Sequence, residues 1–242
     1  IRGSDTGIYL EGTVSQVTIA GLVINGTSYG IQANATTLSN LTFRDLDVSS
    51  TFGTGIGIAA RGPNLVFERI VANRRSTGVS ITNASDVVVD DLTANGAVTA
   101  GLSLTTITGS LTLRKLTLED DVTGLSLATY TPATQLAITP YDPLTQTGTI
   151  VSLAKSDTGI TVAALSNTRF AGLVLDNATA AINANSSTNS GLLFEDLDVS
   201  GSRSTGIGLH LAGPNHIVRR VASNRRGSGL TANTTSNLQI SD

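Results

Sequence analysis

The chain contains no cysteine, methionine or tryptophan, and its 242 residues include only five phenylalanines and four tyrosines. Without cysteine there is neither a disulfide framework nor a thiolate zinc site. With so few aromatic rings, a core has to be filled by Ile, Leu, Val and Ala in thin layers. The composition therefore excludes a small disulfide-linked domain and disfavours a globular core built on large rings.

The excess of one sign of charge over the other is also small, because the net formal charge is −3 at pH 7. A basic surface that would bind nucleic acid is therefore not expected, nor is a polybasic membrane patch. No apolar run approaches the roughly 18 residues needed to cross a bilayer, so no membrane span is predicted. The composition is poor in lysine and rich in Ser, Thr, Asn and Gly, as is common in bacterial extracellular repeat proteins. We therefore expect an extracellular or cell-surface location.

The sequence repeats itself at two periods. "RDLDVSSTFGTGIGIAARGPN" at 44–64 returns as "EDLDVSGSRSTGIGLHLAGPN" at 195–215, which is 151 residues later. Within this long period, a glycine followed by alternating apolar residues recurs about every 23 residues. Such regular spacing is the signature of a solenoid. The first apolar residues of the units are Ile8, Ile31, Ile56, Val79, Leu102, Leu125, Ile160, Ile182, Ile207 and Leu230.

Each unit is predicted to form three short strands. A Gly-led strand is followed by polar residues and then by two alternating strands separated by two residues, as in "LTF-RD-LDV". No 3.6-residue periodicity predicts a helix. Stacking about ten such coils gives an all-β parallel β-solenoid, a single domain over residues 1–242. The long period predicts an internal duplication, 5–155 (six coils, with a long loop at 128–148) and 156–242 (about four coils).

This coil pattern resembles the right-handed parallel β-helix family, which includes pectate lyases, polygalacturonases, mannuronan epimerases, tailspikes and many adhesins. The resemblance covers the whole chain and implies a right-handed β-helix. It is specific for fold and much less so for function. For carbohydrate-active relatives it implies chemistry on the outer face of one sheet, carried by carboxylates, Arg, Lys or His in a groove.

The outward side chains of the Gly-led strand are therefore where chemistry is expected, and they are uncharged. General acid–base catalysis needs a titratable group, and glycoside hydrolysis typically needs two carboxylates. This column of outward, uncharged side chains predicts a face that carries no catalytic residue. It reads Tyr9, Gln32, Gly57, Ser80, Ser103, Ser126, Thr161, Asn183, Gly208 and Thr231.

Charged residues gather instead at the two-residue corner between the second and third strands, for example Arg44-Asp45 and Glu68-Arg69. Their signs largely alternate between neighbouring coils, which predicts ion pairs along the rod that favour correct register. The alternative is a calcium site, because hard cations need several oxygen ligands. No specific motif supports it, so we predict no cofactor. The weak calcium candidates are Asp90, Asp91, Asp120 and Asp121.

Two further groups are expected to be structural. The only histidines, His210 and His216, are predicted to be tolerated surface or edge residues, because the first block has Ala59 and Leu65 there. The "NRR" turn occurs in both blocks. It either binds an acidic sugar or a carboxylate of a neighbouring molecule, or braces adjacent coils. Its arginines, candidate contacts between coils or at the ends, are Arg74, Arg75, Arg225 and Arg226.

The one long step between coils contains the irregular stretch "ATYTPATQLAITPYDPLTQTGTI". Loops on rigid scaffolds concentrate binding, and exposed tyrosine is a common recognition residue. We expect a protruding contact loop with Tyr130, Tyr141 and Asp142 as binding residues. Its "PYDP" resembles part of the Tyr-Gly-x-Asp-Pro-His motif of mannuronan epimerases. Leu144 stands where that motif has histidine, which puts the epimerase reaction in doubt.

Both ends are predicted to be open. The sequence closes on a second strand and a corner ending at Asp242, and it opens at Ile1 on a third strand. Uncapped ends expose strand edges that invite pairing. The expected partner is a second copy, end to end, or the rest of a longer β-helix chain. The predicted function is a non-catalytic fibre, stalk or adhesin shaft. The alternative is an enzyme or carbohydrate-binding module acting on an acidic polysaccharide.

Overall fold

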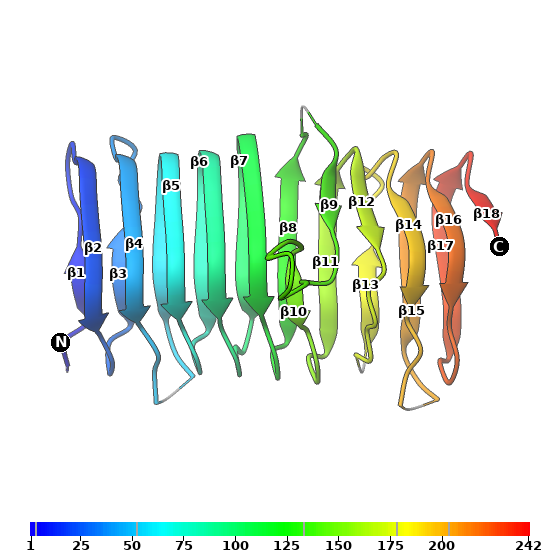
Figure 1. The fold of residues 1–242 in the computed structure, drawn as a ribbon, viewed down its shortest axis with the longest axis horizontal. Helices are drawn as coiled ribbons and strands as arrows, with labels where there is room; N and C mark the ends of the chain where they lie inside the picture. The colour runs from blue at the N-terminus through cyan, green and yellow to red at the C-terminus, as the bar shows by residue number, and fades with distance from the viewer. Residues whose placement is uncertain (3, 52, 133, 178, 203) are drawn as a thin grey trace.

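The computed structural model describes residues 1–242 except residues 3, 52, 133, 178 and 203. The chain winds into a rod of ten stacked coils with its termini at opposite ends (Figure 1). In the described part, every regular element is a strand. Accordingly, that part contains no helix long and apolar enough to span a membrane. The prediction of an all-β parallel solenoid is confirmed.

The Gly-led strands form one continuous parallel sheet, the first sheet, along the whole rod. Each strand bonds to the corresponding strands of the coils before and after it. Three of its strands, β5 to β7, continue into the second and third strands of their coils. In order, the first sheet contains β1 (Thr6–Tyr9), β3 (Tyr29–Ala33), β5 (Ile56–Val71), β6 (Thr77–Thr93), β7 (Ala100–Thr117), β8 (Thr123–Tyr130), β11 (Thr158–Leu165), β13 (Ala180–Ala184), β15 (Ile207–Pro214) and β17 (Ser228–Ser236).

The sheet of second strands is divided after the fifth coil. Its first part consists of β2 (Ser15–Val23), β4 (Ser39–Asp47) and the later halves of β5 to β7. The third strand β10 (Ile150–Ser152) pairs with β7, and the long loop lies at this division. The second part is a separate sheet of β9 (Leu136–Ile138), β12 (Thr168–Ala171), β14 (Leu193–Asp198), β16 (Ile217–Ala222) and β18 (Gln239–Ser241).

A left-handed residue bends the chain between the second and third strands. The second residue of each corner pair has a positive φ, for example 54° at Asp45, 53° at Arg69 and 59° at Asp91. Few residues adopt this conformation, and Asn and Asp tolerate it best. Because the bend recurs at the same place in successive coils, the ladder of strand pairs continues around the corner.

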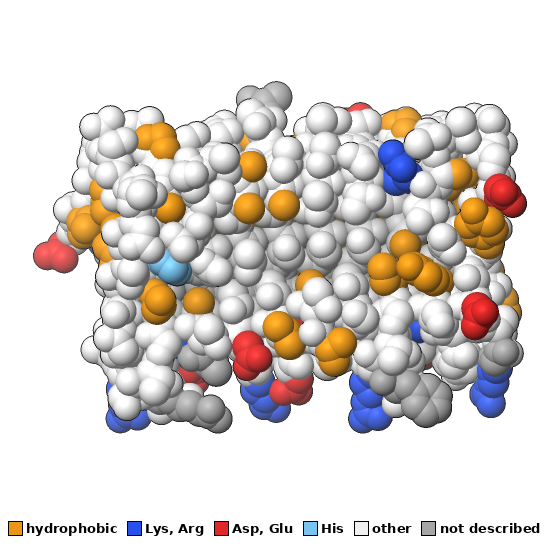
Figure 2. All heavy atoms as spheres, turned by 180° about the vertical axis from the view of Figure 1, so that it is seen from behind, with side chains coloured by type: hydrophobic (Ala, Val, Ile, Leu, Met, Phe, Trp, Pro, Cys, Tyr) orange, Lys and Arg blue, Asp and Glu red, His pale blue; other side chains and the backbone are white. Residues whose placement is uncertain are grey.

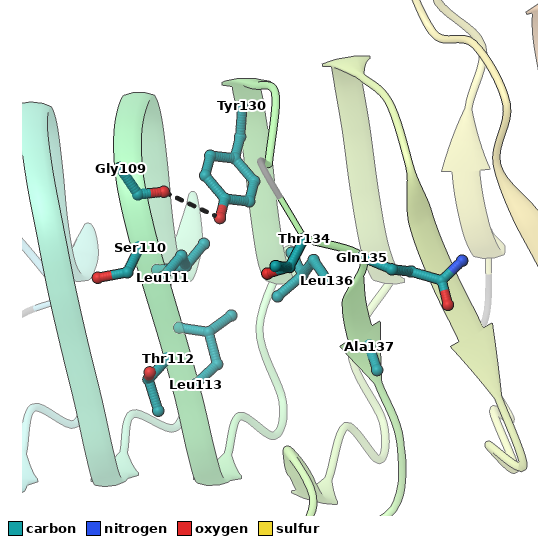
Figure 3. A pocket seen from close by; sticks show the side chains of 10 residues that line it. All are labelled: Gly109, Ser110, Leu111, Thr112, Leu113, Tyr130, Thr134, Gln135, Leu136 and Ala137. Atoms are coloured by element: carbon teal, nitrogen blue, oxygen red, sulfur yellow. Dashed lines mark hydrogen bonds between the residues drawn. The ribbon is translucent and has the colours of Figure 1, made fainter.

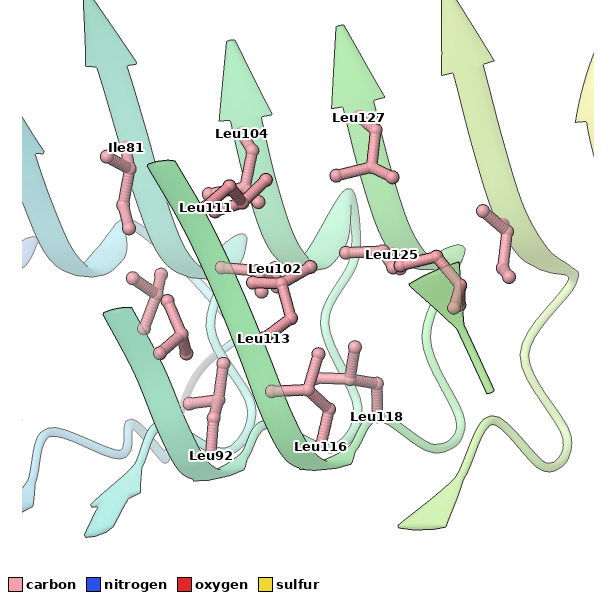
Figure 4. Packing of buried hydrophobic residues seen from close by; sticks show 14 of the residues in the cluster. Ile81, Leu92, Leu102, Leu104, Leu111, Leu113, Leu116, Leu118, Leu125 and Leu127 are labelled. Carbon is pink, nitrogen blue, oxygen red and sulfur yellow. The ribbon is translucent and has the colours of Figure 1, made fainter. Parts of the chain in front are cut away.

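The interior consists of thin aliphatic layers, as predicted (Figure 4). In the fifth coil Leu102 of the first strand, Leu113 of the second and Leu116 of the third are all buried. Phenylalanines of successive coils stack in two places, with ring centroids 4.9 and 5.2 Å apart. These pairs are Phe43–Phe67 and Phe170–Phe194.

A column of glycines lets successive coils approach closely at the start of the first strand. A Cβ atom at Gly57 would overlap the carbonyl oxygen of Gly78 in the next coil. In the third coil the residue in this column is Gly57 rather than Gly55. Ile58 then pairs with Ile31 of the preceding coil and is buried in the core. Glycine is needed in this column because the backbones of successive coils lie too close together for a Cβ atom, and not because the φ angle is positive.

The register predicted from the sequence is therefore wrong by two residues in the third and ninth coils. Alternation at a period of two cannot distinguish the two glycines of "TGIG", because both alternatives keep the same residues inside. The outward position in these coils is Ala59 rather than Gly57, and His210 rather than Gly208.

Candidate functional site

The correct register places a histidine on the outer face of the first sheet. His210 lies beside Asn183 of the preceding coil and Thr231 of the following coil. The prediction that this column contains no group ionisable near neutral pH is therefore wrong. The register predicted from the sequence was off by two residues in this coil and placed Gly208 at the position that His210 occupies. The middle of this face is otherwise mostly uncharged, and charged side chains gather along one long edge (Figure 2).

His210 belongs to a hydrogen-bonded group of amides. Asn233 Nδ2 donates to His210 Nε2 at 2.8 Å and to Asn185 Oδ1 at 3.4 Å. Because an amide nitrogen only donates, Nε2 is the acceptor in this hydrogen bond. His210, Asn183, Asn185 and Thr161 border a hollow of about 230 Å³, which we call the His210 hollow. It presents amide, imidazole and hydroxyl groups suited to a ligand rich in hydroxyls.

His216 is buried, so its prediction as a surface or edge residue is wrong. Its Nδ1 accepts a hydrogen bond from Leu192 N at 3.3 Å, and its Nε2 donates to Ala212 O at 2.9 Å. Its ring meets that of Phe194 edge-on, at a centroid distance of 6.5 Å. Burial lowers the pKa of His216 below its usual value. The neutral ring is therefore a structural bridge within the core.

The corner charges pair between successive coils, as their alternating signs predicted. Arg69 Nε donates to Asp45 Oδ1 at 2.5 Å, and this hydrogen bond lowers the pKa of the Asp45 carboxyl. Exposed pairs contribute little to stability, and their effect is to disfavour a slipped register. The other pairs between coils, among the described residues, are Arg114–Asp90, Lys115–Asp91, Arg169–Glu195, Arg219–Glu195, Arg220–Glu195 and Arg220–Asp196.

The four acidic residues considered as calcium ligands do not converge. Asp90 and Asp91 are held in ion pairs with cations of the next coil. Asp120 is exposed, whereas Asp121 is buried. Over the described residues, no group of three or more His, Asp or Glu side chains is placed to hold a metal ion.

Arg75 in the first "NRR" turn is fully buried and holds three successive turns together. Its Nε donates to Val48 O at 2.6 Å, its Nη1 to Thr27 O at 2.5 Å and its Nη2 to Ser49 O at 3.3 Å. Burial lowers the pKa of Arg75 from its usual value. The carbonyl oxygens belong to the turns of the two preceding coils, so this arginine braces them.

The second "NRR" turn repeats the arrangement. Arg226 is half-buried, and it donates to Val199 O at 2.8 Å and to Leu175 O at 3.1 Å. The preceding residue of each turn, Arg74 and Arg225, is exposed and has a φ of 54° and 53° respectively. The interpretation as a brace between coils therefore holds for Arg75 and Arg226. Binding by Arg74 and Arg225 stays a prediction.

Asp121 is a buried carboxyl group with one unpaired oxygen. Its Oδ1 accepts a hydrogen bond from Ala97 N at 2.6 Å. Its Oδ2 is buried and has no hydrogen-bond partner among the described residues. Burial raises the pKa of Asp121 from 3.8 to about 7, and the neighbouring charges of Asp120 and Glu119 act in the same direction. Of the residues considered from the sequence, this one has the most perturbed titration.

The long loop contains a small closed turn. Tyr141 Oη donates to Gln146 Oε1 at 2.6 Å. Asp142 accepts hydrogen bonds from Leu144 N at 2.9 Å and from Thr145 Oγ1 at 2.8 Å. Hydrogen bonds from this turn lower the pKa of Asp142. The polar atoms of Tyr141 and Asp142 are thus engaged within the loop. A binding role for these two residues stays a prediction.

Tyr130 does not lie with Tyr141 and Asp142, and it is only 5% exposed. It borders a hollow of about 490 Å³ at the division of the second sheet, which we call the slot (Figure 3). Tyr130 Oη donates to Gly109 O at 3.4 Å across its upper end. One wall of the slot is β7 (residues 109–113) and the other wall is the segment 134–137, which includes the start of β9.

The fold and the sequence agree on the family. The family model described as "right handed beta helix region" matches residues 6–131, just over half of the chain. The chain belongs to the right-handed β-helix family. The structure of this β-helix is similar to the crystal structure of an alginate lyase from Paenibacillus sp. str. FPU-7. The TM-score is 0.44 at 8% identity, and 99% of each chain is covered. That likeness is too distant to carry an inference about function. No curated protein matches the sequence.

The end residues of this β-helix occupy strand positions. The amino group of Ile1 donates to Val23 O at 3.0 Å, and Arg2 forms a bridge with Asn25, so both lie where a third strand belongs. Asp242 directly follows β18, at a corner position. The His210 hollow and the slot were not recognised from the sequence. Both depend on which residues of neighbouring coils meet, and local alternation does not reveal this.

Proposed function

We propose that this β-helix is a structural scaffold segment whose end coils pack on further parallel coils. The observation that carries this proposal is the open strand edge at each end of the rod. Among the residues that the structure describes, β1 and β2 pair with the second coil alone, and β17 and β18 with the ninth alone. Large apolar side chains lie at the same ends, with Val23 58% and Ile240 63% exposed.

The two open ends are complementary because all strands of the rod run in parallel. The edge at the end of β18 can bond to the edge at the beginning of the rod without a change of strand direction. A head-to-tail contact of this kind generates a filament if the contact does not close into a ring. Further coils of a longer chain would satisfy the same edges. An extracellular or cell-surface shaft agrees with the cysteine-free, lysine-poor composition.

Electron microscopy and sizing chromatography of the 242-residue chain at several concentrations test this proposal. We expect rods that lengthen with concentration, with an axial repeat of about 50 Å from ten coils spaced ~4.8 Å apart. Ile240→Lys should abolish lengthening because it places a charge in the joint. Val98→Lys, which is equally exposed but lies in the middle of the rod, should not. Monomers at every concentration would contradict the proposal.

A second candidate function, polysaccharide binding, is favoured by the His210 hollow. Asn185, His210 and Asn233 come from three successive coils and form one hydrogen-bonded row along the outer face. Sugar chains are extended and rich in hydroxyls, so a row of amide and imidazole groups parallel to the rod suits them. The first block has Ala59 at the position of His210, so this group is restricted to the later coils.

Titration with alginate, pectate and neutral oligosaccharides, followed by isothermal calorimetry, tests the second candidate. We expect His210→Ala to weaken binding about tenfold, equivalent to about 1.4 kcal/mol. The matched change Ser80→Ala, in the same outward column five coils earlier, should leave the affinity unchanged. Equal affinity of the wild type and His210→Ala for every sugar would exclude the His210 hollow as the site.

A further inference from the structure

The rod is interrupted on two of its three faces at the sixth coil. The second strand of this coil, β9, pairs only with β12 of the following coil. Among the described strands, the third strand, β10, pairs with β7 of the preceding coil, and its Ile150 also forms a bridge with Pro140 of the long loop. The first sheet alone continues through, from β7 to β8 to β11. The second-strand ladder thus has an opening between β7 and β9, and this opening is the slot.

The walls of the slot are strand edges without a paired strand, although Ala137 O of β9 accepts a hydrogen bond from Thr149 Oγ1 at 3.2 Å. On the side facing the sixth coil, β7 pairs with β8 at Leu102–Ile107 and with β10 at Leu116–Thr117. Between these segments no described strand pairs with that edge. At the upper end the hydroxyl of Tyr130 bonds the edge in place of a strand, through Gly109 O and the backbone of Leu111. Backbone N–H and C=O groups need partners, and an open edge is a template for another strand.

The floor of the slot is apolar and nearly buried, with a small exposed area on each leucine. Leu111, Leu113 and Leu136 are 9%, 7% and 8% exposed. Leu65, in the same column as Leu111 two coils earlier, is completely buried. A ligand here therefore needs apolar groups at every second position on one side and a hydrogen-bonding backbone at its edges. A sugar would place hydroxyl groups on leucines without partners, which is unfavourable.

The lower end of the slot adds a preference for acidic residues. Arg114 and Lys115 follow directly on the slot-lining part of β7, and each is paired with an aspartate on the side of the fourth coil. In the later coils a carboxylate accepts from cations on both sides, since Glu195 lies between Arg169 and Arg219. On the slot side Arg114 Nη1 donates to Gln146 O of the long loop at 3.5 Å, and by analogy with Glu195 a peptide carboxylate would replace this long contact.

We propose that the slot binds an extended peptide that pairs in parallel with β7 and β9. The peptide has the pattern apolar-x-apolar followed by an acidic residue. Its apolar side chains cover Leu111, Leu113 and Leu136, its backbone bonds to the open edges, and its carboxylate meets Arg114. A volume of about 490 Å³ lies in the range of binding pockets and suits a short segment. Strand addition of this kind is an established mode of peptide recognition.

A fluorescein-labelled peptide GLLFEDLD, the sequence of residues 191–198, is the probe. In the second sheet this segment places Phe194 in the column of Ile138 and an acidic residue directly after it. We expect saturable binding by fluorescence anisotropy, with slower amide exchange at residues 111–115 and 136–138. The peptide GNLFNDLD keeps the length and replaces one apolar anchor, at the position of Leu192, and the acidic anchor, at the position of Glu195, by asparagine. It should bind about tenfold more weakly.

Thr112→Arg supplies the matched variant. Thr112 is exposed and lines the slot, so an arginine there should hinder entry and weaken binding about tenfold. Thr42→Arg, in the same outward column three coils earlier, should have no effect. Absence of binding, or equal binding to Thr112→Arg and Thr42→Arg, would overturn the proposal. Exchange protection confined to β2 and β18 would also overturn it, while supporting contact at the ends of the rod.

Discussion

Asp121→Asn is expected to make the protein about 2 kcal/mol more stable at pH 8.5. The pKa of Asp121 is raised from 3.8 to about 7 in the folded protein, chiefly by burial. Between these values the native state holds a proton that the unfolded chain releases. The free energy of unfolding therefore decreases by ~1.4 kcal/mol for each pH unit between about 4 and 7, or ~4 kcal/mol in all. Above pH 7 the full penalty is present.

The asparagine removes this penalty and keeps the acceptor for Ala97 N. Its amide nitrogen then replaces the unpaired Oδ2, and a buried donor without a partner costs about 1–3 kcal/mol. The difference leaves a net gain of about 2 kcal/mol, or roughly 4–8 °C in melting temperature for a chain of this size. At pH 4 to 5, where the wild-type carboxyl is protonated, the gain should disappear or reverse.

Urea unfolding of the wild type and Asp121→Asn between pH 4.5 and 8.5 measures this effect. The difference between the two unfolding free energies isolates Asp121, because the other titrating groups cancel. His216, whose pKa is lowered by burial, acts in the opposite direction, since its stabilisation is lost as the pH falls below about 6.5. Thr42→Ala, which removes no titratable group and lies three coils before the coil that ends at Asp121, is the control and should show no pH-dependent difference. A constant difference for Asp121→Asn across the range would refute the raised pKa.

Arg75→Met is expected to destabilise the protein by about 3–5 kcal/mol, because it removes a buried cation with several hydrogen bonds. The methionine fills much of the same volume but leaves the carbonyl oxygens of Thr27, Val48 and Ser49 unsatisfied. Arg75→Lys should fall between the wild type and Arg75→Met, because one ammonium cannot reproduce the planar fork of donors.

Thermal unfolding at one fixed pH measures the loss, and the "NRR" turns offer internal controls. Arg74→Met changes an exposed residue of the same turn and should stay within about 0.5 kcal/mol of the wild type. Arg226→Met removes the equivalent brace from the second block and should cost less than Arg75→Met, because Arg226 is only half-buried. If Arg75→Met were no more damaging than Arg74→Met, the brace between coils would be discounted.

Local alternation and composition were enough to predict the fold. A strand turns one set of side chains inward at every second residue, and this rule works within a few residues of chain. It therefore predicted the three strands of each coil, the thin aliphatic layers and the all-β solenoid. The ladder of corner charges was predictable for a similar reason. A constant spacing of about 23 residues brings the opposite charges of Asp45 and Arg69 onto neighbouring coils.

What the alternation could not reveal depends on distances between coils. Pairing between coils places Gly57 and not Gly55 in the column of the third coil, and the same choice of Gly208 over Gly206 in the ninth coil moves His210 onto the outer face. Both registers satisfy the apolar pattern equally well. Only the pairing between coils separates them, which aligns Ile58 with Ile31 of the coil before and with Val79 of the coil after.

Only the tertiary structure decided which polar groups are buried, which partners they have and where the slot lies. Arg75 and Asp121 look like ordinary turn charges in the sequence. Their partners, such as Thr27 for Arg75, lie far away along the chain, 48 residues in that case. The slot exists because the sixth coil pairs forward through β9 and backward through β10. The sequence determines that these coils stack. Contacts between segments far apart in the chain decide where the stack is continuous, where an arginine braces it and where it has an opening. The alternation of residues within one strand contains no information about these contacts.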